Sequence, residues 1–172
     1  MADKITIDIA LHPLAWKVLM QQYHYDGKAV DVGHGWLYCL IVQGLERQHV
    51  ITSGELRKKP KGLVDGKVYI YADDFLRYGR HLRLSRQANI SRVIQRKELE
   101  KLCNQIAVFH IAAGIERNKV IRHFLEKEDI QEEELSFEAL KKYYQRHYRQ
   151  KEDDIFHDIK ELSKKKRHKT HT

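Results

Sequence analysis

One stretch, between residues 66 and 114, constrains the fold of this chain most, because an alternating segment there runs into the longest helical pattern. Side chains along residues 67–72 alternate as in a half-buried strand, with Val68, Ile70 and Ala72 on one face and Lys67, Tyr69 and Tyr71 on the other. Ser91 stands at the N-cap position of a long helix, and Gly114 stands where that helix should end. The stretch therefore predicts a strand, a short helix over residues 75–82 and a long helix.

The first 45 residues predict the same order of elements. Ile5, Ile7 and Ile9 alternate with polar residues, which indicates a second half-buried strand over residues 4–10. Pro13 suits the first turn of a helix that should extend to about Tyr23, and residues 36–45 predict a more apolar, buried helix. Residues 52–66 follow no sustained period and contain turn signals, among them Asp65-Gly66, so a basic loop or hairpin arm is expected there.

Two further helices are expected after Arg117. Ser136 is placed to cap the second of them, in which Phe137, Leu140, Tyr144 and Tyr148 form an apolar stripe. Residues 155–172 end in a run of like charge and should be disordered when free. The predicted fold class is α+β, predominantly α-helical with a small antiparallel two-stranded sheet. The predicted parts are strand-helix-helix repeats over residues 1–114, a helical hairpin over 115–154 packed on them, and a flexible basic tail.

Composition narrows the class of protein. A chain of 172 residues with 42% hydrophobic and 33% charged residues can form a globular core without metals or disulfides. Cys39 and Cys103 lie inside apolar helical patterns, so both are expected to be free, buried thiols in a reducing, cytoplasmic compartment. No secretion signal and no membrane-spanning run is recognised.

Charge is segregated along the chain, which has a formal net charge of +8. Residues 77–101 contain eight basic and two acidic side chains, whereas residues 126–138 contain seven acidic side chains and one basic. Residues 141–151 and 164–169 each add five basic side chains and no acidic one. Such clustering creates a field that attracts a polyanion, and nucleic-acid phosphates are the commonest one in the cytoplasm.

The two strand-helix-helix passages, residues 4–45 and 67–114, resemble the ribbon-helix-helix family of DNA-binding proteins. In that family two copies pair their strands antiparallel, and outward strand residues enter the major groove. The resemblance implies a tandem arrangement in which one chain supplies both strands, with Lys4, Thr6, Lys67, Tyr69 and Tyr71 as readers. Asp8 and the long connections between helices depart from the family pattern, and a two-stranded sheet packed on helices in another fold is the alternative.

Two other segments carry local resemblances. The run YADDF, residues 71–75, resembles the catalytic box of palm-domain polymerases, in which adjacent aspartates bind two metal ions. The match covers five residues, and the alternative is that Asp73 or Asp74 caps a helix beginning at Phe75. Residues 115–148 resemble a helix-turn-helix whose second helix presents Lys141, Lys142, Gln145, Arg146 and Arg149, and a plain helical hairpin with one basic face is the alternative.

The sequence predicts no catalytic residue, metal site or cofactor. None of the eleven histidines pairs with a cysteine or carboxylate at a convincing ligand spacing, and no nucleophile motif stands out. The main hypothesis is a non-enzymatic nucleic-acid-binding protein, with DNA the favoured ligand, of the size and charge of an accessory or regulatory factor of a mobile element or phage. The alternative is an assembly or adaptor protein, possible as a homo-oligomer, in which the acidic segment meets a basic patch on another protein or another copy.

The residues predicted to contact nucleic acid are basic, amide or tyrosine side chains. Besides the five strand residues above, they come from residues 77–96, from the last helix and from the tail. These are Arg77, Arg80, Arg83, Arg86, Arg92, Arg96, Lys141, Lys142, Gln145, Arg146, Arg149, Lys164, Lys165, Lys166 and Arg167.

Overall fold

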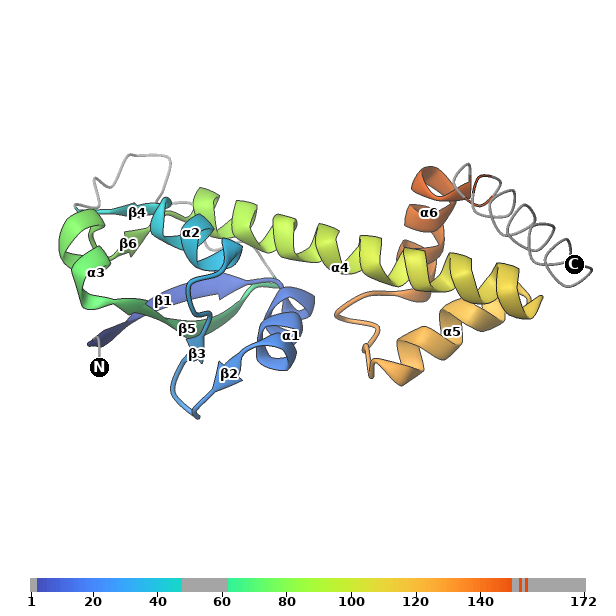
Figure 1. Ribbon diagram of the computed structural model, residues 1–172, viewed down its shortest axis with the longest axis horizontal. Helices are drawn as coiled ribbons and strands as arrows, with labels where there is room; N and C mark the ends of the chain where they lie inside the picture. Colours follow the sequence, from blue (N-terminus) through green and yellow to red (C-terminus); the bar gives the residue numbers. More distant parts are fainter. Residues whose placement is uncertain (1–2, 48–61, 150–151, 153, 155–172) are drawn as a thin grey trace, which may run out of the picture. The chain divides into compact units, whose positions relative to one another are not determined.

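The computed structural model describes residues 3–47, 62–149, 152 and 154. The chain divides into two compact units, Met1–Arg96 and Lys97–Thr172, and the boundary falls inside one long helix, α4 (Figure 1). The sequence predicted that the first part of the chain ends at Gly114. The second half of α4 instead shares a core with the helices that follow it, so it belongs to the second unit.

The first unit alternates short helices with strands. In chain order its elements are β1 (Lys4–Leu11), α1 (Pro13–Gln22), β2 (His24–Tyr25), β3 (Val30–Asp31), α2 (Trp36–Val42), β4 (Leu45–Glu46), β5 (Val64–Tyr71), α3 (Ala72–Tyr78), β6 (His81–Leu82) and the first half of α4 (Leu84–Ala113). The second unit holds the rest of α4 with α5 (Arg117–Lys127) and α6 (Phe137–His147). The predicted α+β class with a predominance of helix is confirmed.

The predicted antiparallel strand pair is present as β1 and β5, which pair along their whole length from Lys4 opposite Tyr71 to Leu11 opposite Val64. The pair belongs to a four-stranded sheet of order β1-β5-β3-β2, in which β3 runs parallel to β5. A separate two-stranded antiparallel sheet joins β4 and β6. Strands of two residues are too short to alternate, so the sequence analysis missed β2, β3, β4 and β6.

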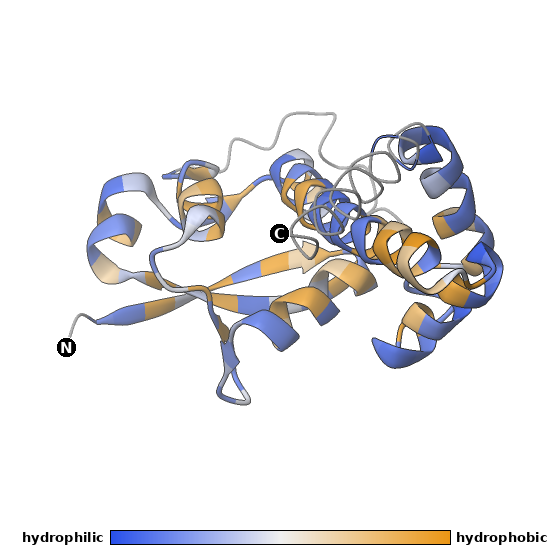
Figure 2. Ribbon diagram, turned by 45° about the vertical axis from the view of Figure 1, so that its right-hand side comes forward, coloured by the Kyte–Doolittle hydropathy of each residue, from blue (hydrophilic) through white to orange (hydrophobic). Residues whose placement is uncertain are grey.

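One face of β1 and β5 forms the core of the first unit. Ile7, Val68 and Ile70 are buried there, and Ile90 and Ile94 from the first half of α4 belong to the same hydrophobic cluster. Figure 1 places α2 and this part of α4 on the same side of the two strands, and Figure 2 shows hydrophobic and hydrophilic residues alternating along the strands. Because strand side chains alternate, the opposite face carries the polar residues.

A tryptophan of α1 packs against β5 at a glycine. The Trp16 indole Nε1 donates a hydrogen bond to the Val64 carbonyl oxygen at 2.7 Å, and a Cβ atom at Gly66 would lie 2.1 Å from the Trp16 ring. The predicted turn at Asp65-Gly66 is therefore wrong, because these residues lie inside β5. The glycine is required by the ring that lies on it.

The long helix begins earlier than the sequence indicated. It starts at Leu84, and Ser91 is buried inside it, where the Ser91 hydroxyl accepts a hydrogen bond from the His12 backbone N–H at 3.0 Å. Gln87, also buried, accepts from the Ala10 N–H at 2.7 Å and donates to the Leu82 carbonyl. The hydroxyl expected to cap the helix instead binds the end of β1. The predicted end is confirmed, since Gly114 follows Ala113 with φ +64°.

The short helix α3 also begins earlier than expected. It starts at Ala72, with Tyr71 as its N-cap, so Asp73 and Asp74 lie in its first turn and neither is the cap residue.

The two cysteines differ from each other in burial. Cys103 is buried, and burial raises the pKa of its thiol to about 12, whereas Cys39 is exposed, which corrects the expectation that both are buried.

The second unit is a three-helix arrangement around one core. Leu102 and Ile106 of α4, Val120 and Phe124 of α5, and Leu140 and Tyr144 of α6 are buried together. The predicted cap of the last helix is confirmed, because the Ser136 hydroxyl accepts from the Ala139 N–H at 3.1 Å. Arg117 binds both carboxylate oxygens of Glu152, at 3.2 and 2.6 Å, and the Tyr144 hydroxyl donates to the same carboxylate at 2.5 Å.

Two predicted segments lie wholly or largely outside the described residues. The tail, with Lys164, Lys165, Lys166 and Arg167, is one, and the greater part of the expected loop at residues 52–66 is the other. None of the described helices combines the length and hydrophobicity needed to span a membrane.

The contact between Trp16 and Gly66 leads to a stability prediction. Gly66→Ala should lower the free energy of unfolding by about 1–3 kcal/mol, because the new methyl group must displace the indole ring. Urea denaturation followed by circular dichroism measures this. Gly35→Ala is the control, since the nearest atom to its new methyl group is 4.0 Å away. Gly35→Ala should lower the free energy of unfolding by less than about 1 kcal/mol. An equal decrease in the two variants would contradict the proposed packing of Trp16 on Gly66.

Candidate nucleic-acid interface

The predicted contact residues lie on three surfaces. The strand residues share one face of the sheet, the arginines of residues 77–96 lie on α3, the following turn and the first half of α4, and the remaining described ones lie on α6 and just beyond it. The first two surfaces belong to the first unit and the third to the second unit.

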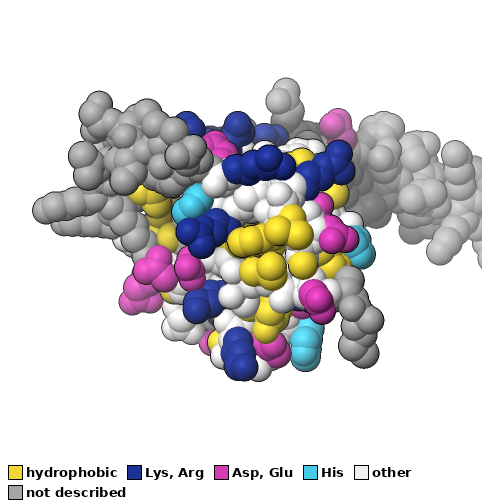
Figure 3. Space-filling model, turned by 90° about the vertical axis from the view of Figure 1, so that its left-hand side faces the viewer, with side chains coloured by type: hydrophobic (Ala, Val, Ile, Leu, Met, Phe, Trp, Pro, Cys, Tyr) yellow, Lys and Arg dark blue, Asp and Glu magenta, His cyan; other side chains and the backbone are white. Residues whose placement is uncertain are grey.

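The arginines nearest to α3 surround its C-terminal end. Arg77 and Arg80 are exposed, and the Arg77 guanidinium lies 5.2 Å from the centre of the Tyr78 ring. Arg83 is half-buried and bound to Glu46, with Nε 2.6 Å from Oε2, so its charge is balanced locally. Figure 3 shows a hydrophobic patch on this side of the first unit, with Lys and Arg side chains and also Asp and Glu side chains around it.

The first half of α4 presents a polar and basic stripe. Ser85, Asn89, Arg92 and Arg96 are exposed and recur every three or four residues, so they share one side of the helix. Buried residues, among them Ile90 and Ile94, occupy the other side, and the exposed Arg86 flanks the stripe.

Acidic side chains are missing from this part of α4. Residues 84–97 contain none, and the first one in the helix, Glu98, is 5% exposed and pairs with Lys101 at 3.0 Å. Arg86 and Arg92 have no hydrogen bond or ion pair with another described residue. Arg86 and Arg92 therefore present positive charge that no described carboxylate balances.

Helix α6 carries a second basic stripe. Lys142, Gln145 and Arg146, with Arg149 just beyond the helix end, are exposed on the side opposite to the buried Leu140 and Tyr144. Lys141 differs from the others, because its ammonium group lies 3.7 Å from Glu138 and 5.6 Å from the centre of the Phe137 ring. The exposed stripe thus consists of three cations and one amide.

The predicted strand readers do share one face of the sheet. Lys4 is paired with Tyr71, Thr6 with Tyr69, and Lys67 with Asp8, and all lie on the polar side of β1 and β5. The polar groups of two of them, Lys4 and Tyr69, are bound by nearby carboxylates. The Lys4 ammonium group pairs with Asp31, and this hydrogen bond raises the pKa of Lys4 and lowers the pKa of Asp31.

Tyr69 is held in the same way by Asp26. Its hydroxyl donates to Asp26 Oδ2 at 2.6 Å, and the backbone N–H groups of Lys28 and Ala29 donate to Oδ1. The Tyr69 hydrogen bond, followed by those from Ala29 and Lys28, lowers the pKa of Asp26 to about 2. The same bond raises the pKa of Tyr69. On the sheet face, Lys4 and Tyr69 are thus already bound to acidic side chains.

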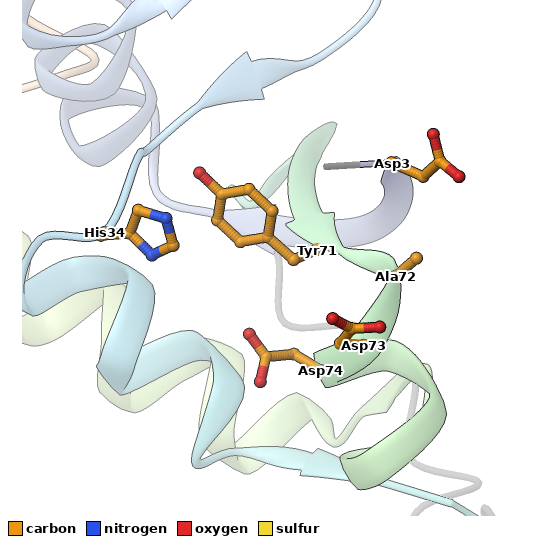
Figure 4. A pocket seen from close by; sticks show the side chains of 6 residues that line it. All are labelled: Asp3, His34, Tyr71, Ala72, Asp73 and Asp74. Carbon is orange, nitrogen blue, oxygen red and sulfur yellow. The ribbon is translucent and has the colours of Figure 1, made fainter. Parts of the chain in front are cut away.

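The end of β5 forms an open pocket of about 520 Å3 (Figure 4). The His34 and Tyr71 rings stack there with centres 4.3 Å apart, and the Asp3 carboxylate points away from those of Asp73 and Asp74. The Tyr38 hydroxyl donates to Asp74 and accepts from the Tyr71 N–H at 3.1 Å. Burial, followed by the bond to Asp74, raises the pKa of Tyr38.

The pocket bears on the resemblance of YADDF to a two-metal site. Among the described residues, no group of three or more His, Cys, Asp or Glu side chains could hold a metal ion. Asp74 serves instead as the acceptor that positions the Tyr38 hydroxyl against β5.

The acidic segment lies between α5 and α6. Glu126, at the end of α5, and Asp129, Glu132 and Glu133, in the connection that follows, are exposed. The second unit therefore presents acidic side chains on this connection and basic ones along α6.

Sequence reasoning missed several residues of these surfaces. Ser85 and Asn89 precede Ser91, where the long helix was expected to begin, so their place on its exposed side went unrecognised. Arg47 follows β4, and its Nε donates to the Arg77 carbonyl oxygen at 3.0 Å. A helix pattern extended back to Leu84 would have identified the first two; no signal in the sequence pairs Arg47 with Arg77.

Comparison with protein-family models, with curated proteins and with solved structures finds no match for this chain.

The hydrogen bonds around Asp26 predict its titration. Because its pKa in the folded state, about 2, lies below the ordinary value of about 3.9, ionised Asp26 stabilises the fold above about pH 4. That contribution is lost as the pH falls from about 4 to about 2. Carbon-detected NMR of the Asp26 carboxyl should give a midpoint near pH 2, and Tyr69→Phe should raise it towards 3.9.

The control for this titration is Tyr25→Phe. It removes the hydroxyl of another exposed tyrosine of the first unit, one that does not donate to Asp26, and should leave the midpoint unchanged. A wild-type midpoint near pH 4 would show that the Tyr69 hydroxyl does not hold the carboxylate.

Proposed function

We propose that this protein binds nucleic acid, with DNA as the favoured ligand, and that its phosphate contacts come from exposed helix faces. The observation that carries the proposal is the stripe on the first half of α4. There, Arg92 and Arg96 share the exposed side with Ser85 and Asn89, and residues 84–97 contain no acidic side chain. Solubility is served by interspersed charges of both signs, so a helix face with cations alone favours binding of a polyanion.

The dimensions of the stripe suit a phosphate backbone. From Ser85 to Arg96 it covers about 17 Å of helix at about 1.5 Å per residue. Duplex DNA carries one negative charge per roughly 1.7 Å of its axis, so several phosphates fall within this length. Arginine binds phosphate in a bidentate way, while serine and asparagine add neutral hydrogen bonds that fix position. The stripe thus combines charge with positioning groups.

The stripe on α6 supplies a second, separate contact surface. Lys142, Arg146 and Arg149 have the same helical spacing, and Gln145 adds an amide that can bind a phosphate or a base edge. Two binding surfaces in one chain raise the overall affinity for a long polyanion, because the second contact becomes intramolecular. The basic tail, including Lys164 and Arg167, would extend the contacts. The proposal assigns no catalytic residue and no cofactor.

The sheet face is left out of the proposed interface. Lys4 and Tyr69 are already bound to Asp31 and Asp26, so a phosphate there would compete with carboxylates. Like charges brought close together cost free energy, and the sheet face carries Asp8 as well. The ribbon-helix-helix arrangement, which would place this face in the major groove, is therefore not the basis of the proposal.

Removing two arginines of α4 tests the proposal. Arg86→Gln with Arg92→Gln should weaken binding to a 30-base-pair duplex by on the order of 10-fold to 100-fold near 0.1 M salt. It should also reduce the slope of log affinity against log salt by about 2. Fluorescence anisotropy of labelled duplex, titrated at several salt concentrations, measures both quantities. Arg146→Ala with Arg149→Ala should produce an effect of the same kind if α6 contributes.

A matched control removes the same charge elsewhere. Lys28→Gln with Lys119→Gln deletes two exposed cations outside both stripes, and should change the affinity and the salt slope far less. If the control weakens binding as much as the arginine pair, only total charge matters and the α4 stripe is not the site. If the wild-type protein binds neither duplex DNA, single-stranded DNA nor RNA, the proposed function fails.

A second candidate function is protein assembly, and the exposed acidic connection between α5 and α6 favours it. Its carboxylates could meet the arginine stripe of another copy, which predicts association that salt dissolves. Light scattering at low and high salt should then give a larger mass at low salt. Glu132→Gln with Glu133→Gln should abolish the difference. A monomer at low salt would exclude this candidate and leave nucleic-acid binding as the use of the stripe.

A further inference from the structure

The C-terminal part of α3 exposes the most water-accessible large hydrophobic side chain among the described residues. Leu76 is 71% exposed, and Tyr78, two residues further on, is 37% exposed. Neither side chain belongs to the hydrophobic core of either unit. The neighbouring Phe75 does pack against the core of the first unit. A single exposed leucine is common on protein surfaces, so the side chains around it decide whether it marks a binding site.

Arginines lie on one side of this leucine, towards the end of α3, and the exposed Asp73 lies one turn before it. Arg77 follows it directly, and Arg47 and Arg80 are exposed in the segments that meet the end of α3. The space-filling view shows hydrophobic side chains on this side of the first unit, with Lys and Arg side chains beside them and Asp and Glu side chains further along the rim (Figure 3). An apolar side chain with arginines beside it suits a partner that offers apolar surface next to negative charge.

The end of α3 is held firmly, so the leucine is presented in one position. The Gly79 N–H donates to the Phe75 carbonyl oxygen at 2.9 Å, and Arg47 donates to the Arg77 carbonyl oxygen at 3.0 Å. Gly79 has φ +104°, and a Cβ atom there would lie 2.3 to 2.4 Å from backbone atoms of Glu46 and Arg47. Glycine is thus required for the close approach of this turn to β4. The preformed shape reduces the entropy lost on binding.

DNA duplexes offer apolar surface next to negative charge. The faces of stacked base pairs are apolar, and a phosphate lies on each side of every step. Proteins that kink DNA insert a leucine or a similar side chain between base pairs from the minor groove, with arginines beside it. We infer that Leu76 is an intercalating wedge, which enters a base step of duplex DNA while Arg77 and Arg80 contact the flanking phosphates.

This inference rests on the proposed function, and it adds a mode of binding and a substrate class. A chain that uses the α4 stripe alone would leave the base pairs stacked, because phosphate contacts on one face need no unstacking. A wedge instead bends the duplex at the step it enters, most easily at flexible TA or CA steps. Bending and phosphate binding can therefore be measured separately.

The experiment uses the full chain and a 30-base-pair duplex with fluorophores at its ends and 2-aminopurine beside a central TA step. Wild-type protein should raise energy transfer between the ends and raise 2-aminopurine fluorescence, which reports unstacking. Leu76→Ala should lose most of both signals and bind up to about 10-fold more weakly, as expected for a lost apolar contact, with an unchanged salt slope. Leu76→Met, which keeps a side chain capable of intercalation, should restore both signals.

Met20→Ala is the matched control. Met20 is also in the first unit and is 50% exposed, but it lies on α1, so its loss should leave bending unchanged. A wild-type protein that binds the duplex and leaves it straight and stacked overturns the wedge while the proposed function stands. The same holds if Leu76→Ala bends the duplex as the wild type does. Failure of the wild type to bind any nucleic acid overturns both, and points to a protein partner for the patch around Leu76.

Discussion

The antiparallel pairing of β1 with β5 is the constraint on which the first unit depends. It joins residues about sixty positions apart, and the strand period of two then puts Ile7, Val68 and Ile70 in the core. A slip of one residue would turn the whole apolar set towards water, so the pairing and the core fix each other. Because Tyr71 ends β5 and α3 follows at once, the register also determines where α3 begins and where Leu76 is presented.

The direction in which the arginines of α4 point follows from the same strand. Gln87 and Ser91, both buried, accept hydrogen bonds from the backbone N–H groups of Ala10 and His12, at the end of β1 and just beyond it. Buried polar groups that lose their partners cost about 1–3 kcal/mol each. These two bonds therefore resist rotation of the helix about its axis. With them in place, Arg92 and Arg96 are turned to the exposed side, and the basic stripe is a consequence of how the helix is attached.

Sequence patterns predicted the elements whose own residues determine them. The long strands, the helices that begin at residues 13, 36 and 117, and the Ser136 cap all follow from local periodicity or local hydrogen bonding, although the second helix ends at Val42 and not at residue 45, which lies in β4. The errors fall where a distant partner decides. Ser91 caps nothing because the His12 N–H binds its hydroxyl, and Asp65-Gly66 is no turn because Trp16 lies on the glycine. The sequence identified the basic side chains. The tertiary structure was needed to show which of them lie on exposed helix stripes and which lie on the sheet face, where Lys4 is bound to Asp31.

The positions of the acidic side chains determine where the first unit exposes positive charge. Asp26, Asp31 and Asp74 accept hydrogen bonds from Tyr69, Lys4 and Tyr38, and Glu46 binds Arg83. Each of these carboxylates binds a side chain that positions the sheet, α2 or β4, whereas residues 84–97 contain no acidic side chain. The fold therefore separates acidic from basic side chains within this unit. Such a separation concentrates the attraction for phosphate on the helix face and the α3 end, which is where the proposed contacts lie.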